Sequence, residues 1–570
     1  MGSYIVEETS SGRKTLIYKN TKETRLHSAY DPVKEAERSV DSFKKGRASI
    51  ILVSGLALGY HVPLLRKKFP EDLIVVLENS SDVVKLARKH CPENFADAVI
   101  ITSISELSVI FETIDMSGFR GIAHYIHRAS YQLNQQFYDS LVSDIKQYIT
   151  SKTSDLLTRF EFERRWIENI FLNLPYMFSS YPVSNLFGKF KGYPGIIVSA
   201  GPSLRNNVSM LDKIKDKALI VSVDTAYGVL LKNKISPHIV MTLDAQKYSI
   251  KHFLGQKSKE PLLLADIVSY GKISREFPGE KAFSTTSKFY QGADGKTKRE
   301  TTPAIDWLEK IIGSIGDIQS GGSVATSVFD LLLNLGCDPI ILVGQDLAYT
   351  GREIHVSGTY HNDDWFPQTN RILNLDTINQ KVIRKRKIKY VDSFGGSEPV
   401  VSDLVFDLYK GWFEDSATKV PVKVINATEG GARLKNIPEN TLEKLALSIK
   451  KNNNPPSEVL KNALTGKKFS GKEKLISGLK KGLDDINEIE RIANLQQDKL
   501  SLTSEIFSII NKSGMESIFM PYLRKINVYL SRNDIDETKA SEFIIRDVLS
   551  AVENLKVLMS NAHAALVKMQ

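Results

Sequence analysis

Five short apolar segments in the middle of the chain each end at a polar or glycine-rich tip. They cover residues 195–200, 218–223, 238–243, 261–265 and 339–344, and four of the tips carry Asp224, Asp244, Asp266 and Asp346. Continuous apolar runs of this length, separated by helix-sized segments, are typical of buried parallel strands. The carboxyl ends of parallel strands lie along one edge of a sheet, where open α/β folds bind ligands. The sequence therefore predicts a polar, nucleotide-sized crevice between about residues 195 and 430.

The bulk composition is that of a globular chain with more than one hydrophobic core. Of its 570 residues, 42% are hydrophobic and 25% are charged, so two to four domains are expected. The two cysteines, Cys91 and Cys337, are too few for a disulfide scaffold and fit a reducing compartment. The first residues lack the pattern of a signal peptide, and no apolar run is long enough to cross a bilayer. We expect a cytoplasmic location.

The formal net charge of +10 favours anionic partners. Its densest cluster is the basic run Lys381–Lys389, which contains no aromatic residue before Tyr390. Binding of nucleic acid typically interleaves basic residues with aromatic ones. We therefore interpret this run as a solvated face and expect no nucleic-acid partner.

The chain divides by pattern into an α/β N-terminal part, an α/β central part and a helical C-terminal part. Residues 1–155 contain predicted strands at 48–53, 72–77 and 98–102, which indicates a Rossmann-like domain. Residues 156–194 form a predicted connecting helix and linker, and residues 195–435 hold the crevice described above. From 436 to 570, apolar residues recur at spacings of three and four, which predicts amphipathic helices.

A glycine turn follows the first predicted strand of the N-terminal part. Gly55 and Gly59 flank this turn, and the next strand ends at Glu78. Such an arrangement binds nucleosides in Rossmann-like domains, so a methyltransferase that uses S-adenosylmethionine is one interpretation. The turn has no central glycine, however, and its leucine and alanine side chains would crowd a ligand. A purely structural domain is therefore the favoured interpretation.

Two glycine- and serine-rich turns stand before predicted helices in the central part. The first consists of Gly201, Pro202, Ser203 and Leu204, and the second runs from Gly321 through Gly322 and Ser323 to Thr326. Pro202 suits a first helical position, and Ser203 can cap free backbone N–H groups. Helix N-termini of this kind favour phosphate. Either turn alone can be a helix start that binds nothing, but their joint presence beside the aspartates favours binding.

The segment after the strand at 339–344 carries the candidates for acid–base chemistry. Asp346, Tyr349, His355 and His361 offer hydrogen-bond donors and a general base. The spacing of the two histidines matches no familiar zinc motif, and we predict no metal site. A further polar tip, which includes Glu429, follows a predicted strand at 420–425. The sequence contains no P-loop, no Gly-x-Ser-x-Gly elbow and no Asp-x-Asp pair at a strand end.

Together, these motifs resemble those of the motility-associated factor (Maf) flagellin glycosyltransferases. The segments that carry the resemblance are 201–204, Asp224 with 226–227, 235–244, 321–326, 343–350 and 426–432, and upstream 55–60 and Glu78. The resemblance implies a Rossmann-like N-terminal domain, a central α/β domain similar to bacterial sialyltransferases and to 6-hydroxymethylpterin pyrophosphokinases, and an α-helical C-terminal domain. It implies transfer of a pseudaminic- or legionaminic-type sugar from a CMP-activated donor to Ser or Thr of flagellin, in the cytoplasm.

The resemblance also implies roles for individual residues. Gly201, Ser203 and the turn 321–323 would hold the nucleotide and its phosphate, with Pro202, Leu204, Thr326 and Glu429 in the same binding region. Asp224 and Asp244 would orient the ribose, base or sugar. Tyr349 would stabilise the leaving phosphate, beside Asp346. His355 would be the general base, with His361 as second candidate, and a pKa near neutrality would suit that proton transfer.

No cofactor is expected beyond the CMP-sugar substrate, and nothing in the sequence indicates a divalent metal. Flagellin, with or without its chaperone, is the expected partner. Two alternatives remain open: a pyrophosphokinase that acts on a pterin alcohol with ATP and Mg²⁺, and a non-enzymatic flagellar assembly factor.

Overall fold

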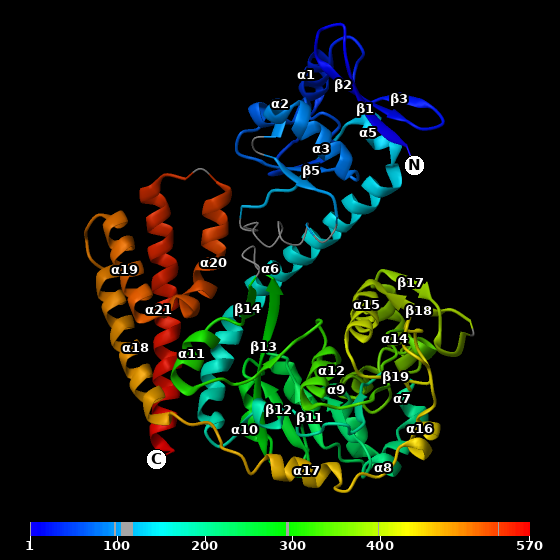
Figure 1. Cartoon of the computed structure of the whole chain (residues 1–570). Coiled ribbons are helices and arrows are strands. Elements are labelled where there is room, and N and C mark those ends of the chain that lie inside the picture. Colours follow the sequence, from blue (N-terminus) through cyan, green and yellow to red (C-terminus); the bar gives the residue numbers. More distant parts are fainter. Residues whose placement is uncertain are drawn as a thin grey trace. The chain divides into compact units, whose positions relative to one another are not determined.

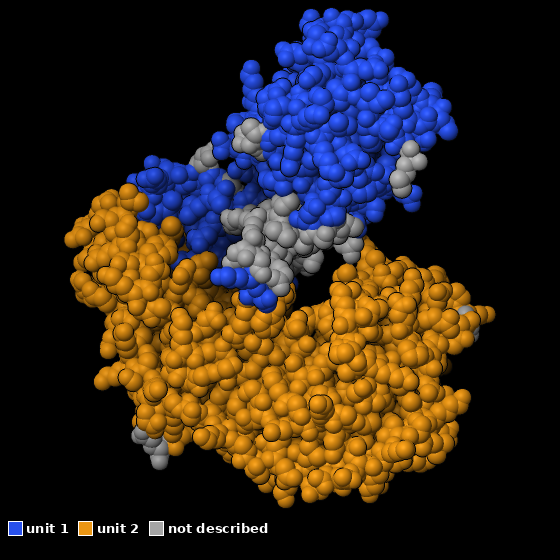
Figure 2. Space-filling view, in the orientation of Figure 1, with its two compact units in different colours: residues 1–161, 290–298, 523–543 blue, residues 162–289, 299–522, 544–570 orange. Residues whose placement is uncertain are grey.

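The structure is a computed structural model that describes residues 2–95, 98–103, 106, 118–291, 296–396, 398–533 and 535–569 (Figure 1). It separates into two compact units, which Figure 2 colours differently. The first comprises residues 1–161, 290–298 and 523–543, and the second comprises 162–289, 299–522 and 544–570. The division by sequence into 1–155, 156–194, 195–435 and 436–570 stays a prediction.

The first unit contains a parallel sheet in the order β6-β5-β4-β7. Its strands are β4 (Ile50–Ser54), β5 (Leu73–Leu77), β6 (Val99–Ile101) and β7 (Ile122–Ile126). The three strands predicted from continuous apolar runs are confirmed within two residues. The sequence did not predict β7, in which buried and more exposed residues alternate. The chain passes from β4 to β5 on one side, while β7 pairs with β4 on the other, so the strand order reverses at β4.

Helices cover both faces of this sheet. One core contains Val53, Val76 and Leu65, and the opposite core packs Leu52 and Val75 against the start of α6. The helices are α1 (Pro32–Ser42), α2 (His61–Lys68), α3 (Ser81–His90), η1 (Pro92–Phe95), α5 (Arg128–Leu133) and α6 (Gln135–Met177). Strands β1 (Ser3–Glu8), β2 (Lys14–Lys19) and β3 (Glu23–Arg25) form a small antiparallel sheet.

The second unit is built on a larger parallel sheet whose strands are almost completely buried. The order β13-β12-β11-β10-β9-β16-β19 is parallel at every pair. The strands are β9 (Gly195–Val198), β10 (Leu219–Val223), β11 (Ile239–Thr242), β12 (Leu262–Asp266), β13 (Lys281–Gln291), β16 (Ile340–Val343) and β19 (Val424–Asn426). The five central strands are confirmed, whereas only the end of the strand predicted at 420–425 forms β19. The strand order reverses between β9 and β16.

Helices and short elements surround this sheet. The α-helices are α7 (Leu204–Asn207), α8 (Met210–Ile214), α9 (Asp224–Lys232), α10 (Gly271–Glu276), α11 (Ile305–Ile312), α12 (Val324–Leu335), α13 (Tyr360–Trp365), α14 (Leu375–Arg384), α15 (Leu404–Lys419), α16 (Leu442–Ser448) and α17 (Pro456–Ala463). The 3-10 helices are η2 (Val183–Leu186), η3 (Lys247–His252), η4 (Thr350–Arg352), η5 (Phe366–Gln368) and η6 (Phe394–Gly396). The remaining strands are β8 (Tyr181–Pro182), β14 (Thr297–Thr301), β15 (Asp317–Ile318), β17 (Ile388–Val391) and β18 (Val400–Asp403).

The predicted connecting helix lies within α6 and is anchored by two buried asparagines. Asn169 Nδ2 donates to the carbonyls of Ala245 and Val268, and Asn173 Nδ2 donates to those of Ile267 and Ser269. These four carbonyls follow β11 and β12, so the end of α6 fixes the loops at the carboxyl ends of those strands.

The C-terminal region is helical, as predicted. It contains α18 (Lys472–Ala493), α19 (Lys499–Ser513), α20 (Glu516–Arg532) and α21 (Glu537–Lys568). On α18 the predicted apolar stripe is buried at Leu479, Ile486 and Ile489. Among the described residues, every helix falls short of the length and hydropathy that a membrane span requires.

Candidate active site

A pocket of about 180 Å³ opens where the strand order of the second unit reverses. Ligands bind outside the carboxyl ends of parallel strands at such a point, because the flanking loops diverge there. The pocket is lined by the tips of β9 and β16 and by the starts of α9 and α12. Of the residues predicted from the sequence, five line it together: Gly201, Asp224, Ser323, Asp346 and His355.

The carboxylate of Asp346 ties the tip of β16 to the turn after β9. Ser203 donates to it twice, through its hydroxyl at 2.5 Å and its backbone N–H at 3.2 Å, and the Thr350 hydroxyl donates at 2.5 Å. Burial raises the pKa of Asp346, and these hydrogen bonds oppose the shift. The sequence-based expectation that Ser203 caps α7 is therefore wrong, because its hydroxyl is committed to Asp346.

The start of α12 is an ordered helix N-terminus at the pocket wall. Ser323 and Thr326 form a reciprocal capping box, in which each side chain accepts the other's backbone N–H at 3.3 Å. The Thr326 hydroxyl also accepts the N–H of Gly321 at 2.9 Å. Ser323, Val324 and Ala325 line the pocket. The positive end of a 12-residue helix dipole therefore faces the space where a phosphate could bind.

Removal of the cap should weaken the second unit measurably. We expect Ser323→Ala to lower the free energy of unfolding by about 1 kcal/mol, because the N–H of Thr326 loses its side-chain acceptor. Ser323→Asn retains a capping oxygen and should cost clearly less. Urea denaturation followed by tryptophan fluorescence measures this, since all four tryptophans lie in the second unit. Equal losses in the two variants would contradict the capping role.

Two predicted aspartates lie at neighbouring strand tips. Asp224 is 4% exposed and accepts hydrogen bonds from the Thr242 hydroxyl at 2.9 Å and from the N–H of Thr225 at 2.7 Å. Asp244 does not line the pocket and accepts the N–H of Gln246 at 2.9 Å. Burial raises the pKa of Asp244, with the negative charge of Asp224 adding to the shift. The two carboxylates thus act on each other electrostatically.

Three histidines gather beside these carboxylates. The rings of His355 and His361 stack with centroids 4.9 Å apart, and His252 lies 6.2 Å from His361. His252, at the end of η3, is a residue that the sequence analysis missed. Its only sequence signal is its place eight residues after Asp244. Burial lowers its pKa, while Asp224 and Asp244 oppose the shift.

The pKa of His355 lies well below the near-neutral value that would suit a general base. Burial, followed by the nearby His361 and His252, lowers the pKa of His355 to about 3. Burial likewise lowers the pKa of His361 to about 4. Both rings are therefore neutral at pH 7. His355 has a nitrogen lone pair available for a proton, although its proton affinity is low until a ligand changes its surroundings.

These depressed pKa values predict loss of stability in acid. An unfolded histidine has a pKa near 6.5, so His355 and His361 stabilise the fold fully above that pH. Their contribution is lost as the pH falls from about 6.5 toward 3 or 4, because the unfolded chain binds the protons first. We expect the free energy of unfolding of the second unit to drop by about 2 kcal/mol or more between pH 7 and pH 5. Urea denaturation followed by tryptophan fluorescence at pH 7 and pH 5 measures this drop in free energy. His355→Asn should make the drop smaller.

The remaining predicted site residues lie outside the pocket lining. Pro202 and Leu204 are buried, and Leu204 belongs to the hydrophobic core. The Tyr349 hydroxyl donates to Asp403 of β18 at 2.6 Å, and Tyr349 does not line the pocket. Glu429 Oε1 accepts the N–H of Leu442 at the start of α16. Gly321 and Gly322 lead into Ser323 without lining the pocket themselves.

The N-terminal glycine turn is filled by the protein itself. Leu56, Ala57 and Leu58 are completely buried. The carboxylate of Glu78 accepts the N–H groups of Leu56 and Ser80 at 3.0 and 3.1 Å, and His27 Nε2 accepts that of Leu58 at 2.9 Å. The Glu78 carboxylate, which could have bound a ribose, is therefore occupied by hydrogen bonds to the glycine turn and to Ser80.

Comparisons with known proteins agree with this architecture. Residues 168–352 match the family model described as 6-hydroxymethylpterin diphosphokinase MptE-like. Two uncharacterised proteins of Treponema pallidum (strain Nichols) are similar: one is 25% identical over 268 residues (46% of each chain), and the other is 22% identical over 205 residues (32% of this chain, 50% of the relative). The chain thus spans about half the length of the curated relatives it matches.

The structural similarity extends over almost the whole chain. The MAf glycosyltransferase from Magnetospirillum magneticum AMB-1 superimposes with a TM-score of 0.57 at 13% sequence identity, which covers 99% of this chain and 93% of that one. Similarity at this identity establishes the fold. The resemblance drawn from the sequence motifs is therefore confirmed in architecture: this chain has the fold of a Maf glycosyltransferase, built around an MptE-like central domain.

Proposed function

We propose that this protein is a glycosyltransferase that moves a nonulosonic sugar of pseudaminic or legionaminic type from a CMP-activated donor to Ser or Thr hydroxyls of flagellin. The observation that carries the proposal is the pocket at the reversal of strand order between β9 and β16, in a chain with the Maf glycosyltransferase fold. The reaction takes place in the cytoplasm, and the protein acceptor arrives free or bound to its chaperone.

The proposed reaction is an inverting displacement that requires no cofactor. The acceptor oxygen forms a bond to the anomeric carbon, the bond from that carbon to the phosphate oxygen breaks, and CMP leaves with the electron pair. The N-terminus of α12 faces the leaving phosphate. Neutral His355 accepts the proton of the acceptor hydroxyl. Asp224, held by Thr242 and Thr225, orients the donor's hydroxyl groups.

The family match at residues 168–352 favours one specific alternative, a diphosphokinase that acts on a pterin alcohol. Thermal unfolding in the presence of each nucleotide separates the two. CMP should raise the melting temperature and ATP with Mg²⁺ should not, whereas the diphosphokinase requires the opposite result. A protein that neither nucleotide stabilises would favour the non-enzymatic assembly factor.

The acceptor is tested by the intact mass of flagellin from a strain that lacks this protein. We expect a mass loss in multiples of a nine-carbon acidic sugar. Complementation with Asp224→Ala should leave the mass low, while the exposed control Lys435→Ala should restore it. Flagellin of unchanged mass in the deletion strain would refute this acceptor.

A further inference from the structure

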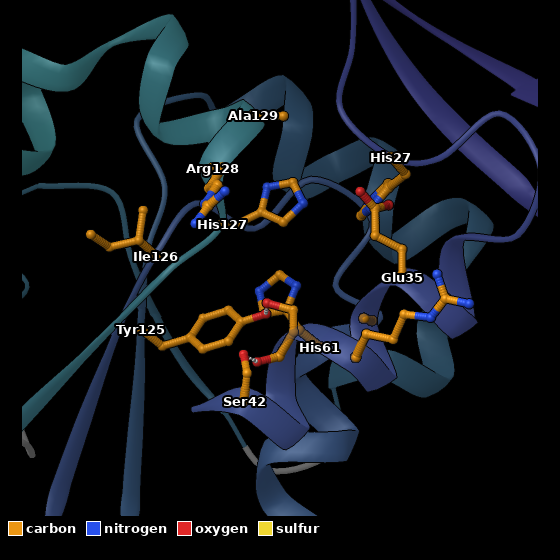
Figure 3. A pocket seen from close by; sticks show the side chains of 12 residues that line it. His27, Glu35, Ser42, His61, Tyr125, Ile126, His127, Arg128 and Ala129 are labelled. Carbon is orange, nitrogen blue, oxygen red and sulfur yellow. Dashed lines mark hydrogen bonds between the residues drawn. The ribbon is translucent and has the colours of Figure 1, made fainter. Parts of the chain in front are cut away.

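A second pocket, separate from the candidate active site, lies at the carboxyl end of the sheet in the first unit. It encloses about 350 Å³ and is lined by residues of α1, by His61 of α2 and by the chain that leaves β7. A groove of about 690 Å³ shares five of its lining residues, among them Ser42, Tyr125 and Arg128, so the two spaces adjoin each other. Figure 3 shows this pocket.

The strand topology of the first unit favours ligand binding at this pocket. The strand order of the first unit reverses between β4 and β7, and the pocket contains Tyr125 and Ile126 at the end of β7 and His127 just after it. Such reversals leave a crevice in open α/β sheets. The glycine turn after β4 is closed by Glu78 and His27. A ligand would therefore contact the α1 and β7 side of this crevice.

The inner wall contains a buried imidazole whose ring nitrogens make no well-formed hydrogen bond. His61 stacks between Tyr125 and His127, with ring centroids 5.3 and 5.2 Å apart (Figure 3). It is 1% exposed, and neither of its ring nitrogens makes a hydrogen bond of regular geometry. Buried polar groups are almost always paired. Burial, followed by the nearby His127, lowers the pKa of His61, and a contact with the backbone of Gly55 opposes the shift. The neutral ring has one donor and one acceptor nitrogen, which suit hydroxyl groups.

The mouth of the pocket is basic. Arg38 on α1 and Arg128 at the start of α5 are exposed, and neither has an ion pair within the described part of the chain. Lys44 lines the adjoining groove. The one carboxylate of the lining, Glu35, already accepts the N–H of Ser28 at 2.6 Å. Guanidinium groups favour carboxylate and phosphate through paired hydrogen bonds.

We propose that this pocket binds a small polyhydroxylated organic anion, with its carboxylate or phosphate on Arg38 and Arg128 and its hydroxyls toward His61. The described residues contain no cluster of three His, Cys, Asp or Glu side chains arranged to hold a metal ion, which argues against a metal at the histidines. The site lies in the first unit, whereas the proposed transfer reaction is assigned to a pocket of the second unit.

Calorimetric titration of the full chain tests the proposal, in an Asp224→Asn background that weakens the central pocket. The probes are ribose 5-phosphate, N-acetylneuraminate, inorganic phosphate and uncharged ribose. At least one of the two sugar anions should bind, and the stronger of them identifies phosphate or carboxylate as the recognised group. Ribose should bind much more weakly, and so should inorganic phosphate, since one lacks the charge and the other the hydroxyls.

Substitution of Arg38 and Arg128 tests whether these two side chains bind the anion. Arg38→Ala combined with Arg128→Ala should weaken binding at least tenfold, because charge-assisted hydrogen bonds are lost. Arg47→Ala with Arg88→Ala removes the same charge from exposed positions of the same unit outside the pocket, and should change affinity less than twofold. All four side chains are exposed, so folding should be preserved. Equal effects of the two double variants, or no binding of either sugar anion at millimolar concentration, would overturn the proposal.

Discussion

Gly201→Ala should destabilise the second unit by about 3 kcal/mol and abolish its candidate active site. A Cβ at position 201 would collide with the Asp346 carboxylate and with the carbonyl of Gly344. Neither can retreat, because Asp346 is held by Ser203 and Thr350 and the carbonyl of Gly344 accepts the N–H of Gly201. Urea denaturation with tryptophan fluorescence measures the loss.

Gly228 is the matched control for this substitution. It lies in helix α9 of the same unit, and a Cβ there would meet nothing within 4 Å. Gly228→Ala should therefore be neutral or stabilising by up to about 1 kcal/mol, since alanine favours a helix. If Gly201→Ala were as well tolerated as Gly228→Ala, the close approach of Asp346 to position 201 would be wrong.

His355→Asn should reduce sugar transfer by a factor of about 10² to 10⁴, the usual contribution of a general base. The ring lines the pocket and is neutral at pH 7. Asparagine keeps a polar group but cannot take up the proton. Binding of CMP should change little, so that kcat falls while the affinity for the nucleotide is retained. Turnover with purified flagellin and nucleotide titration measure the two quantities.

His563→Asn is the control, because His563 lies on α21 and does not line the pocket. It should leave transfer unchanged. If His355→Asn retained most of the wild-type rate, the base would have to be another group of the cluster, and His252, which acts electrostatically with Asp224 and Asp244, is the first alternative. Parallel loss of CMP binding and of turnover in His355→Asn would instead indicate a binding role.

The sequence allowed prediction of elements whose pattern is local. Strands β9, β10 and β16 are continuous apolar runs because both faces of the sheet are covered. Strand β7 and the hairpin of β17 and β18 were missed, because β7 and β17 alternate in exposure and are more polar. The capping box of Ser323 was also predictable as a helix start, since it depends on residues three positions apart.

The site was predictable only in part. Gly201, Asp224, Asp346 and His355 were predicted from the ends of strands, and Ser323 was predicted from a turn before a helix. The fold brings all five to one pocket. Which partner each side chain contacts depends on residues far away in the sequence, which a local sequence pattern does not reveal. Tyr349 points to Asp403 on β18, an element that the sequence did not reveal, and Ser203 serves Asp346 at a separation of 143 residues.

The enclosure of Asp346 has a consequence for the energetics of ligand capture. Three segments of the chain meet at this residue: the turn at Ser203, the tip of β16 and the loop after β19. In that loop, the Ala432 N–H donates to the Asp346 carbonyl at 2.7 Å. Hydrogen bonds thus hold Asp346 in place at the pocket. We therefore expect little loss of conformational entropy around Asp346 when a ligand binds. The binding free energy then orients the ligand rather than ordering the pocket.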